Sequence, residues 1–205
     1  MNSQSAGKSS DLVGMTPQRL HAELLSQEEI KAYLQGALHD GTFSQNHRYR
    51  ISQKGTEWLE VLRKMFGRLG HRSWIYKEGK QREVHVIETL ADFLDFSFDP
   101  LTLHDGNARA AYIRGFFDAE GGMPHHREAR FYIQLCQKDK KKMRTLKLML
   151  QNLGVACGEI HNPSKRVDPE YWRLYIAAAS HRDFARIIGS WHPKKQKILE
   201  ERKMI

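Results

Sequence analysis

Acidic residues end two apolar stretches of the chain, and their placement predicts a particular chemistry. AAYIRGFFDAEGG at 110–122 leads into Asp118 and Glu120, and AYLQGALHDG at 32–41 leads into Asp40. The stretch at 110–122 begins as a helix too apolar for the surface, and each of the two stretches delivers a carboxylate at the end of its helix. Two acids brought together repel unless they share a cation. A hard divalent cation such as Mg²⁺ suits carboxylate oxygens and, bridging phosphate, supports phosphodiester hydrolysis.

The acids meet only if the two helices that carry them pack together, and small residues predict this contact. Ala32 and Gly36 lie four residues apart in the first stretch, as Ala111 and Gly115 do in the second. Small residues at this spacing let two helix backbones approach closely. Because the pattern occurs twice, we expect the two helices to form the joint between two halves of the molecule.

The rest of the chain is duplicated as well. YRISQKGTEWLEVLRKMFGRLG at 49–70 aligns with IQLCQKDKKKMRTLKLMLQNLG at 133–154 at a constant offset of 84, so that Gln53-Lys54 falls on Gln137-Lys138. A strand followed by an apolar helical stripe is expected in each copy. Sequential hairpins form antiparallel sheets. We therefore predict an α+β fold of two pseudo-symmetric αββαββα halves with four-stranded sheets.

The pattern also predicts element and domain boundaries. The opening helices are expected at about 27–39, with a Ser26-x-x-Glu29 capping box, and at about 108–119, capped by Asn107. Closing helices, opened by Thr89 and Ser180, are expected at about 89–95 and at about 180–202, the latter interrupted at Pro193. The predicted division is 1–25 as an N-terminal tail with a possible short helix, 26–95 as the first half, 96–106 as linker and 107–205 as the second half.

Composition limits the partners and the compartment. The chain has 33 Lys and Arg against 24 Asp and Glu, a formal charge of +9 that favours a polyanion such as nucleic acid. Cys136 and Cys157 form no CxxC pair, which suits a reducing compartment. No apolar run approaches the roughly 18 residues that span a bilayer, and the N-terminus has no secretory or transit pattern. We expect a cytoplasmic, nucleoid or organellar protein that is not secreted.

These residues resemble a known family. YIRGFFDAEG at 112–121 resembles a LAGLIDADG motif, and YLQGALHDG at 33–41 resembles a shortened one, in which His39 replaces the usual acid. The chain from about 26 to 203 is similar to monomeric two-motif LAGLIDADG homing endonucleases. The resemblance implies a saddle in which two antiparallel sheets straddle DNA. It also implies that Asp40 and Glu120 bind the metals that cut the two strands, while Asp118 is not carried over as catalytic.

The resemblance implies further active-site residues. Gln53 and Gln137 match positions that help order water, Lys54 and Lys138 follow them, and Lys195 matches a late basic residue near the active site. The first half has DPLTLHDG in the corresponding region and offers no lysine. The implied catalytic set is therefore chemically unequal between the halves: Asp40, Glu120, Gln53, Gln137, Lys54, Lys138 and Lys195.

Strand alternation separates the side chains that pack under the helices from those that face DNA. The residues expected under the helices are Tyr49, Ile51, Val84, Val86, Phe131, Ile133, Leu135, Trp172, Leu174 and Ile176. The residues expected to contact DNA are Arg48, Arg50, Ser52, Lys77, Glu83, His85, Arg130, Tyr132, Gln134, Tyr171, Arg173 and Tyr175. Among such residues arginine pairs with guanine and glutamine with adenine in the major groove, whereas lysine more often holds phosphate.

Several functions remain open at the level of sequence. The first is a monomeric, site-specific endonuclease that uses Mg²⁺ to hydrolyse both strands of a long asymmetric DNA duplex. The second is a maturase that binds intron RNA on the same scaffold, and the third is a noncatalytic DNA-binding protein. Retention of both acids favours the nuclease without excluding a maturase. A zinc site is disfavoured because His125-His126 lacks ligand spacing, and neither a nucleophile elbow nor a phosphate-binding glycine loop is found.

Overall fold

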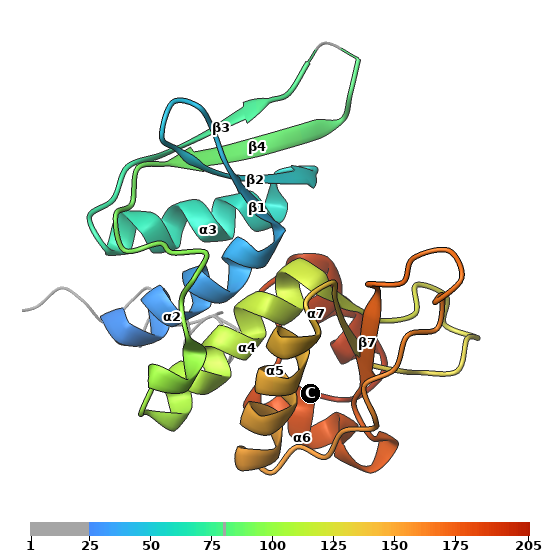
Figure 1. Ribbon diagram of the computed structural model, residues 1–205. Helices are drawn as coiled ribbons and strands as arrows, with labels where there is room; N and C mark the ends of the chain where they lie inside the picture. Colours follow the sequence, from blue (N-terminus) through green and yellow to red (C-terminus); the bar gives the residue numbers. More distant parts are fainter. Residues whose placement is uncertain (1–24, 80) are drawn as a thin grey trace, which may run out of the picture.

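A computed structural model of the protein describes residues 25–79 and 81–205 (Figure 1). The short helix expected between Thr16 and Leu25 falls on residues outside the described ranges, apart from Leu25, which has no regular structure. Within the described ranges, no helix is long and apolar enough to cross a membrane. The two cysteines, Cys136 and Cys157, are both free thiols.

The first part of the chain forms a four-stranded antiparallel sheet covered on one face by a helix. Its elements are α2 (Gln27–Ala37), η1 (Leu38–Asp40), β1 (Gly41–Phe43), β2 (Tyr49–Lys54), α3 (Glu57–Arg68), β3 (Ser73–Lys77) and β4 (Val84–Thr89). The strand order is β1-β2-β4-β3. The apolar stripe of α3 faces the sheet because residues three and four apart share one side of a helix. Its buried members are Trp58, Leu59, Leu62, Met65 and Phe66.

The second part repeats this plan with a reduced sheet. After η2 (Pro100–Thr102) in the intervening segment, its elements are α4 (Gly106–Glu120), β5 (Gly121–Gly122), β6 (Gln134–Gln137), α5 (Lys140–Asn152), β7 (Trp172–Tyr175), η3 (Ala178–Ser180), α6 (His181–Ile187) and α7 (Pro193–Glu201). Among the described residues the sheet has the three strands β5-β6-β7. Two isolated bridges, Cys157 with Ile176 and His161 with Arg173, stand where a fourth strand was expected.

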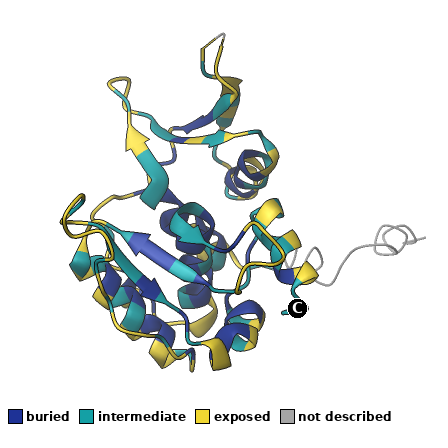
Figure 2. Ribbon diagram, turned by 90° about the vertical axis from the view of Figure 1, so that its right-hand side faces the viewer, coloured by how far each residue is buried: buried dark blue, intermediate teal, exposed yellow. Residues whose placement is uncertain are grey.

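Helices α2 and α4 lie side by side between the two sheets, and among the described elements they make the most extensive contact (Figure 1). A Cβ atom on Gly36 would lie 2.1 Å from the carbonyl oxygen of Tyr112, and one on Gly115 would lie 2.0 Å from that of Tyr33. The backbones therefore touch at both glycines, as the sequence predicted. The buried residues around this contact form one apolar core that extends into both parts (Figure 2).

Local hydrogen bonds correct several predicted helix boundaries. The Ser26 and Glu29 capping box is present, but α4 begins at Gly106 and is capped by Asp105 rather than Asn107. The chain after β4 forms turns instead of a helix at 89–95. There the Thr89 hydroxyl accepts from the amide of Ala91, which makes a tight turn rather than an N-cap.

The closing helix of the second part is interrupted before Pro193, as predicted, and forms α6 and α7. Ser180 stands at the N-cap position of α6 as predicted, but its side chain does not cap the helix. The Ser180 hydroxyl makes no cap hydrogen bond to α6 and instead accepts from the amide of Ala156. Because proline lacks an amide hydrogen, it suits the first turn of a helix, and α7 begins at Pro193.

Candidate active site

The two motif acids lie at the ends of adjacent elements and act on one another electrostatically. Asp40 ends η1, Glu120 ends α4, and a glycine follows each acid as the chain enters a strand. Burial and the neighbouring Asp40 raise the pKa of Glu120 to about 7, against the opposing effect of Lys195. Burial also raises the pKa of Asp40, opposed by Gln53 and Lys195. Such mutual repulsion is the condition that a shared cation relieves.

The two glutamines make different contacts. The Gln53 side chain donates from Nε2 to Oδ2 of Asp40 at 2.9 Å, which orients that carboxylate. The Gln137 side-chain oxygen accepts from the amide of Lys138 at 2.7 Å, so its amide nitrogen is left for another partner. Lys54 and Lys138 are exposed at the strand ends. Only the first glutamine thus contacts a motif acid.

Lys195 reaches the same acids from α7. Its ammonium donates to the backbone carbonyls of Phe117 and, at 2.9 Å, of Asp118, near the C-terminal end of α4. Helix carbonyls at this end favour a cation. Burial lowers the pKa of Lys195 to about 8, opposed by Asp118, Glu120 and Asp40. The sequence-predicted lysine therefore lies beside both motif acids.

Asp118, which the sequence analysis left without a role, is buried and fully hydrogen-bonded. It accepts from the Tyr33 hydroxyl at 2.6 Å and from the Ser190 hydroxyl. It also accepts from the amides of Trp191 at 2.8 Å and His192 at 3.1 Å. A carboxylate with four donors joins α2, α4 and the segment that precedes α7. Asp118 thereby positions the helix that carries Lys195.

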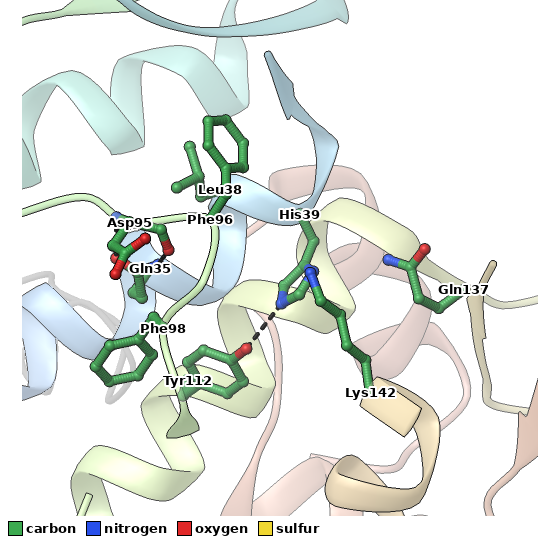
Figure 3. A pocket seen from close by; sticks show the side chains of 9 residues that line it. All are labelled: Gln35, Leu38, His39, Asp95, Phe96, Phe98, Tyr112, Gln137 and Lys142. Atoms are coloured by element: carbon green, nitrogen blue, oxygen red, sulfur yellow. Dashed lines mark hydrogen bonds between the residues drawn. The ribbon is translucent and has the colours of Figure 1, made fainter. Parts of the chain in front are cut away.

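His39 occupies the corresponding place in the first motif. An offset of 79 places Tyr33 on Tyr112 and His39 on Asp118, and the Tyr112 hydroxyl lies 2.7 Å from Nε2 of His39 (Figure 3). Burial, with Lys142 nearby, lowers the pKa of His39 to about 4, so the ring is neutral near pH 7 and its Nε2 can accept a hydrogen bond from the Tyr112 hydroxyl. Each motif tyrosine thus reaches across to the last turn of the opposite motif.

The predicted linker also takes part in this symmetry. SFDP at 97–100 and SWHP at 190–193 repeat at an offset of 93. The Gln35 side chain bonds both backbone groups of Asp95, and Arg114, its counterpart, donates to the carbonyls of Ile188 and Ile187. The offset places Thr102 where the second part has Lys195. The lysine near the acids therefore has a hydroxyl as its counterpart in the first part.

Comparison with known proteins decides the family. Homing endonuclease I-ApeI of Aeropyrum pernix is 30% identical to this chain over 193 residues, which cover 82% of this chain and 85% of that protein. Residues 107–189 match the family model described as LAGLIDADG-like domain. The chain belongs to the LAGLIDADG homing endonuclease family.

Solved LAGLIDADG structures share the fold. I-DmoI in complex with DNA and Mn superposes with a TM-score of 0.60 at 20% identity, covering 80% of this chain and 98% of that one. Full-length DUF199/WhiA from Thermatoga maritima gives a TM-score of 0.63 at 19% identity, covering 88% of this chain and 62% of that one. At these identities the likeness shows the fold, and it confirms the predicted α+β architecture.

The outward face of the second sheet in this LAGLIDADG protein agrees with the predicted alternation. Leu135 opposes Leu174, and both are fully buried on the helix side. Gln134 opposes Tyr175, and Arg173 opposes Cys136, on the other face. The ring of Tyr132 contacts that of Tyr175, the Tyr171 hydroxyl lies 3.4 Å from Arg173, and Arg130 is exposed in the preceding loop.

In the first sheet the alternation predicted for β4 is wrong. Arg50 opposes Glu88 and Ser52 opposes Val86, so Val84 and Val86 share the face of Arg50 rather than that of the helices. His85 opposes Gln53 and Lys77, which places Lys77 and His85 on the helix side with Ile51. Glu83 precedes β4 and is exposed.

The error in β4 has a physical reason. The sequence Val-His-Val-Ile at 84–87 has apolar residues at both even and odd positions, and both Val86 and Ile87 are buried. Only Ile87 belongs to the main core cluster, in which it lies beside Ile51. Because both faces of β4 are covered, hydropathy alone does not fix which one meets α3.

The described residues offer no complete set of protein ligands for a metal ion at the motif acids. No group of three or more His, Cys, Asp and Glu residues within the described ranges forms a metal cage. A cavity of about 140 Å³ lies between the two parts beside His39 and Tyr112, and Gln137 and Lys142 line it from the second part (Figure 3). A cation at the acids would thus take two protein carboxylates and other oxygens from water or phosphate, as Mg²⁺ does.

The raised pKa of Glu120 predicts how the stability of the metal-free protein depends on pH. Between the ordinary value of 4.5 and about 7, folded Glu120 keeps a proton that the unfolded chain releases, so the free energy of unfolding falls as pH rises. Glu120→Gln removes this cost and stabilises the protein at pH 8 by on the order of 1 kcal/mol, after allowance for solvent screening. Urea denaturation with a chelator at pH 5 and pH 8 measures the difference.

Glu128→Gln is the matched control, since Glu128 is exposed. It is expected to leave the difference in stability between pH 5 and pH 8 unchanged. Equal effects of the two substitutions would contradict the electrostatic coupling of Glu120 to Asp40.

Proposed function

We propose that this protein is a site-specific DNA endonuclease that acts as a monomer and hydrolyses both strands of a long asymmetric duplex with a divalent cation. The observation that carries the proposal is the meeting of Asp40, Glu120 and Lys195 where the two motif helices end. A shared cation explains why two repelling carboxylates are placed together in a partly buried site. Membership of the homing endonuclease family supports the same reaction class.

Asp40 and Glu120 would hold the cation, and the donor set fits Mg²⁺ or another hard divalent ion. When bound, the ion supplies charge stabilisation at the scissile phosphate and an activated water. Solved relatives with this fold include I-DmoI complexes described with Mn and with Ca. Because the pKa of Glu120 is about 7, cation binding near neutral pH displaces part of its proton.

The other site residues orient the Asp40 carboxylate and neutralise negative charge on the phosphate. Gln53 holds the Asp40 carboxylate through its 2.9 Å hydrogen bond. Lys195 carries its charge at neutral pH, because its pKa is about 8, and it stabilises the negative charge that develops on phosphate oxygens. Gln137, Lys54 and Lys138 lie at the ends of the corresponding strands, where we assign them water ordering and phosphate contacts.

Both sheets contribute to DNA binding in this proposal. The residues assigned to DNA from the sequence retain that assignment except Lys77 and His85, which the strand register puts on the helix side of the first sheet. The division into halves at 26–95 and 107–205 is retained as well. The intervening segment is assigned to the packing of the first half, because 97–100 repeats 190–193.

The two alternative functions make different predictions. The similar solved structures give no support for intron RNA as a partner. The I-DmoI complexes among them contain DNA. A noncatalytic protein would bind duplex DNA and leave it intact. The presence of both motif acids favours cutting.

Selection of cleaved sequences from a random duplex library tests the proposal. The expected result is enrichment of one long asymmetric sequence cut on both strands with Mg²⁺ and left intact with a chelator. Selection of bound but uncut duplexes would establish the noncatalytic alternative. Cutting that persists with the chelator would contradict the role given to the acids.

DNA binding is expected to weaken steeply with salt, because each neutralised phosphate releases counterions. A protein with six to ten phosphate contacts loses affinity by about 10³ to 10⁵ between 50 and 200 mM salt. Gel-shift titrations at several salt concentrations measure the slope, and Lys138→Gln should reduce it by about one. Lys64→Gln, on the exposed side of α3, is the control and should leave the slope unchanged. A flat response to salt would contradict binding along the duplex backbone.

A further inference from the structure

Arg173 lies in the middle of the outward face of the second sheet, held by two tyrosines. Strand β7 pairs with β6 on one side, and Arg173 itself bridges to His161 on the other. One terminal nitrogen of the guanidinium donates to the Tyr175 hydroxyl at 2.9 Å, and the other lies 3.4 Å from the Tyr171 hydroxyl. Figure 2 looks onto the side of the molecule on which β7 lies in Figure 1.

The guanidinium keeps its charge and part of its donor capacity. Its carbon lies 5.4 Å from the ring centre of Tyr171 and 5.7 Å from that of Tyr175, so the group is braced by neutral aromatic partners. No ion pair of Arg173 with a carboxylate is found in the described ranges. Two hydroxyl contacts use one hydrogen on each terminal nitrogen, and a second hydrogen remains on each. Donors left on both terminal nitrogens can pair with the O6 and N7 acceptors of a guanine edge.

The arginines of the first sheet are held differently. Arg48 pairs with Glu88 at 2.9 Å, and Arg50 pairs with Glu78 at 2.8 Å and with Glu88 at 3.1 Å. Glu88 is 8% exposed, and it also accepts from the Tyr76 hydroxyl at 2.7 Å. These contacts pair both guanidinium groups with carboxylates and use one terminal nitrogen of each as a hydrogen-bond donor. Base contacts by Arg48 or Arg50 therefore compete with ion pairs to Glu88, which is largely buried.

We propose that the two sheets read DNA unequally, with Arg173 as a guanine-reading residue in the half-site under the second sheet. Arg48 and Arg50 contribute little direct reading of the other half-site. A guanidinium fixed before binding loses little entropy when it pairs with a base, whereas an ion-paired one must first give up its carboxylates. The inference rests on the proposed DNA function and adds which residue selects which feature of the target.

The test compares the bound-sequence profiles of the full chain and three variants, selected from random duplexes with a chelator present to prevent cutting. Arg173→Lys keeps the charge but loses the two-pronged donor, so it should reduce preference for one G·C pair by about tenfold to a hundredfold. Arg50→Lys is the corresponding variant of the first sheet, and the ion pairs of Arg50 with Glu78 and Glu88 predict a change in preference of less than threefold at any position. Tyr175→Phe removes the hydroxyl that accepts from Arg173, and it should give an intermediate loss of preference at the same G·C pair as Arg173→Lys. Melting curves verify that each variant folds.

The possible outcomes separate this inference from the proposed function. If the unsubstituted chain selects one sequence and Arg173→Lys selects it with an unchanged profile, guanine reading by Arg173 is overturned while the DNA function stands. If Arg50→Lys alters the profile as strongly as Arg173→Lys, the inequality of the sheets is overturned. If the unsubstituted chain enriches no duplex, the proposed function fails and this inference fails with it. A uniform loss of affinity in Arg173→Lys, with no change in base preference, would show a phosphate contact and would also overturn the inference.

Discussion

Glu120→Gln is expected to abolish double-strand cutting while leaving DNA binding intact, and Asp40→Asn should do the same. Each substitution replaces a carboxylate by a nearly isosteric amide and removes the negative charge that a cation requires. Loss of a group that stabilises transition-state charge costs on the order of a thousandfold in rate. Cleavage of the selected duplex with Mg²⁺, measured beside gel-shift affinity without metal, separates the two effects.

Exposed acids provide the controls for this experiment. Glu128 lies in the loop after β5, and the side chain of Asp92 is 92% exposed in the turn after β4. Glu128→Gln and Asp92→Asn change the net charge by the same amount and should cut at the normal rate. Full activity in either motif variant would remove the basis for the proposed metal site, whatever its effect on affinity.

The sequence predicted that the two motif acids lie close together, because their placement depends on local patterns that occur twice. The apolar motif helices, the small residues at Gly36 and Gly115, and the late lysine at Lys195 are each visible as residue types at fixed spacing. Close backbone contact at both glycines bears out the predicted helix pair. Duplication strengthened each prediction, because a residue pattern that arises by chance in one half is not expected to recur at the equivalent place in the other.

The residues that the sequence analysis missed act through tertiary contacts that no spacing reveals. Asp118 takes its donors from Tyr33 and from 190–192, more than 70 residues away. The available signal was the repeat of SFDP in SWHP, whose second copy supplies three of those four donors. A linker that repeats a segment of the second half is expected to pack as that segment does.

The remaining errors come from ambiguity in local preference. Thr89 is a good N-cap residue, yet the chain after it turns instead, because its hydroxyl also donates to the carbonyl of Arg72 and joins the end of β4 to the chain before β3. Strand β4 has apolar residues at both odd and even positions. Its pairing with β2, rather than its own sequence, therefore decides which of its side chains face α3. In both cases a neighbour in space overrode the intrinsic preference.

Gly115→Ala is expected to destabilise the protein by about 3 kcal/mol or more, a large part of the roughly 5–15 kcal/mol that holds a domain folded. The new Cβ would lie 2.0 Å from the carbonyl oxygen of Tyr33 and 2.8 Å from the amide nitrogen of Ala37, both of them backbone atoms of α2. Backbone atoms cannot rotate away as a side chain does, so the helices must separate. Gly36→Ala should act likewise, since its Cβ would meet Tyr112 at 2.1 Å. Thermal and urea denaturation of the metal-free proteins give the loss.

Gly67→Ala is the matched control, because Gly67 lies in helix α3 with no atom within 4 Å of an added Cβ. Alanine there should stabilise the protein by about 0.5–1 kcal/mol through helix propensity alone. Equal melting of the Gly115 and Gly67 variants would contradict the close approach of α2 and α4. Because that approach also places Asp40 beside Glu120, Gly115→Ala should lose stability and cutting together. Glu120→Gln should lose cutting alone, and this contrast separates the architecture of the site from its chemistry.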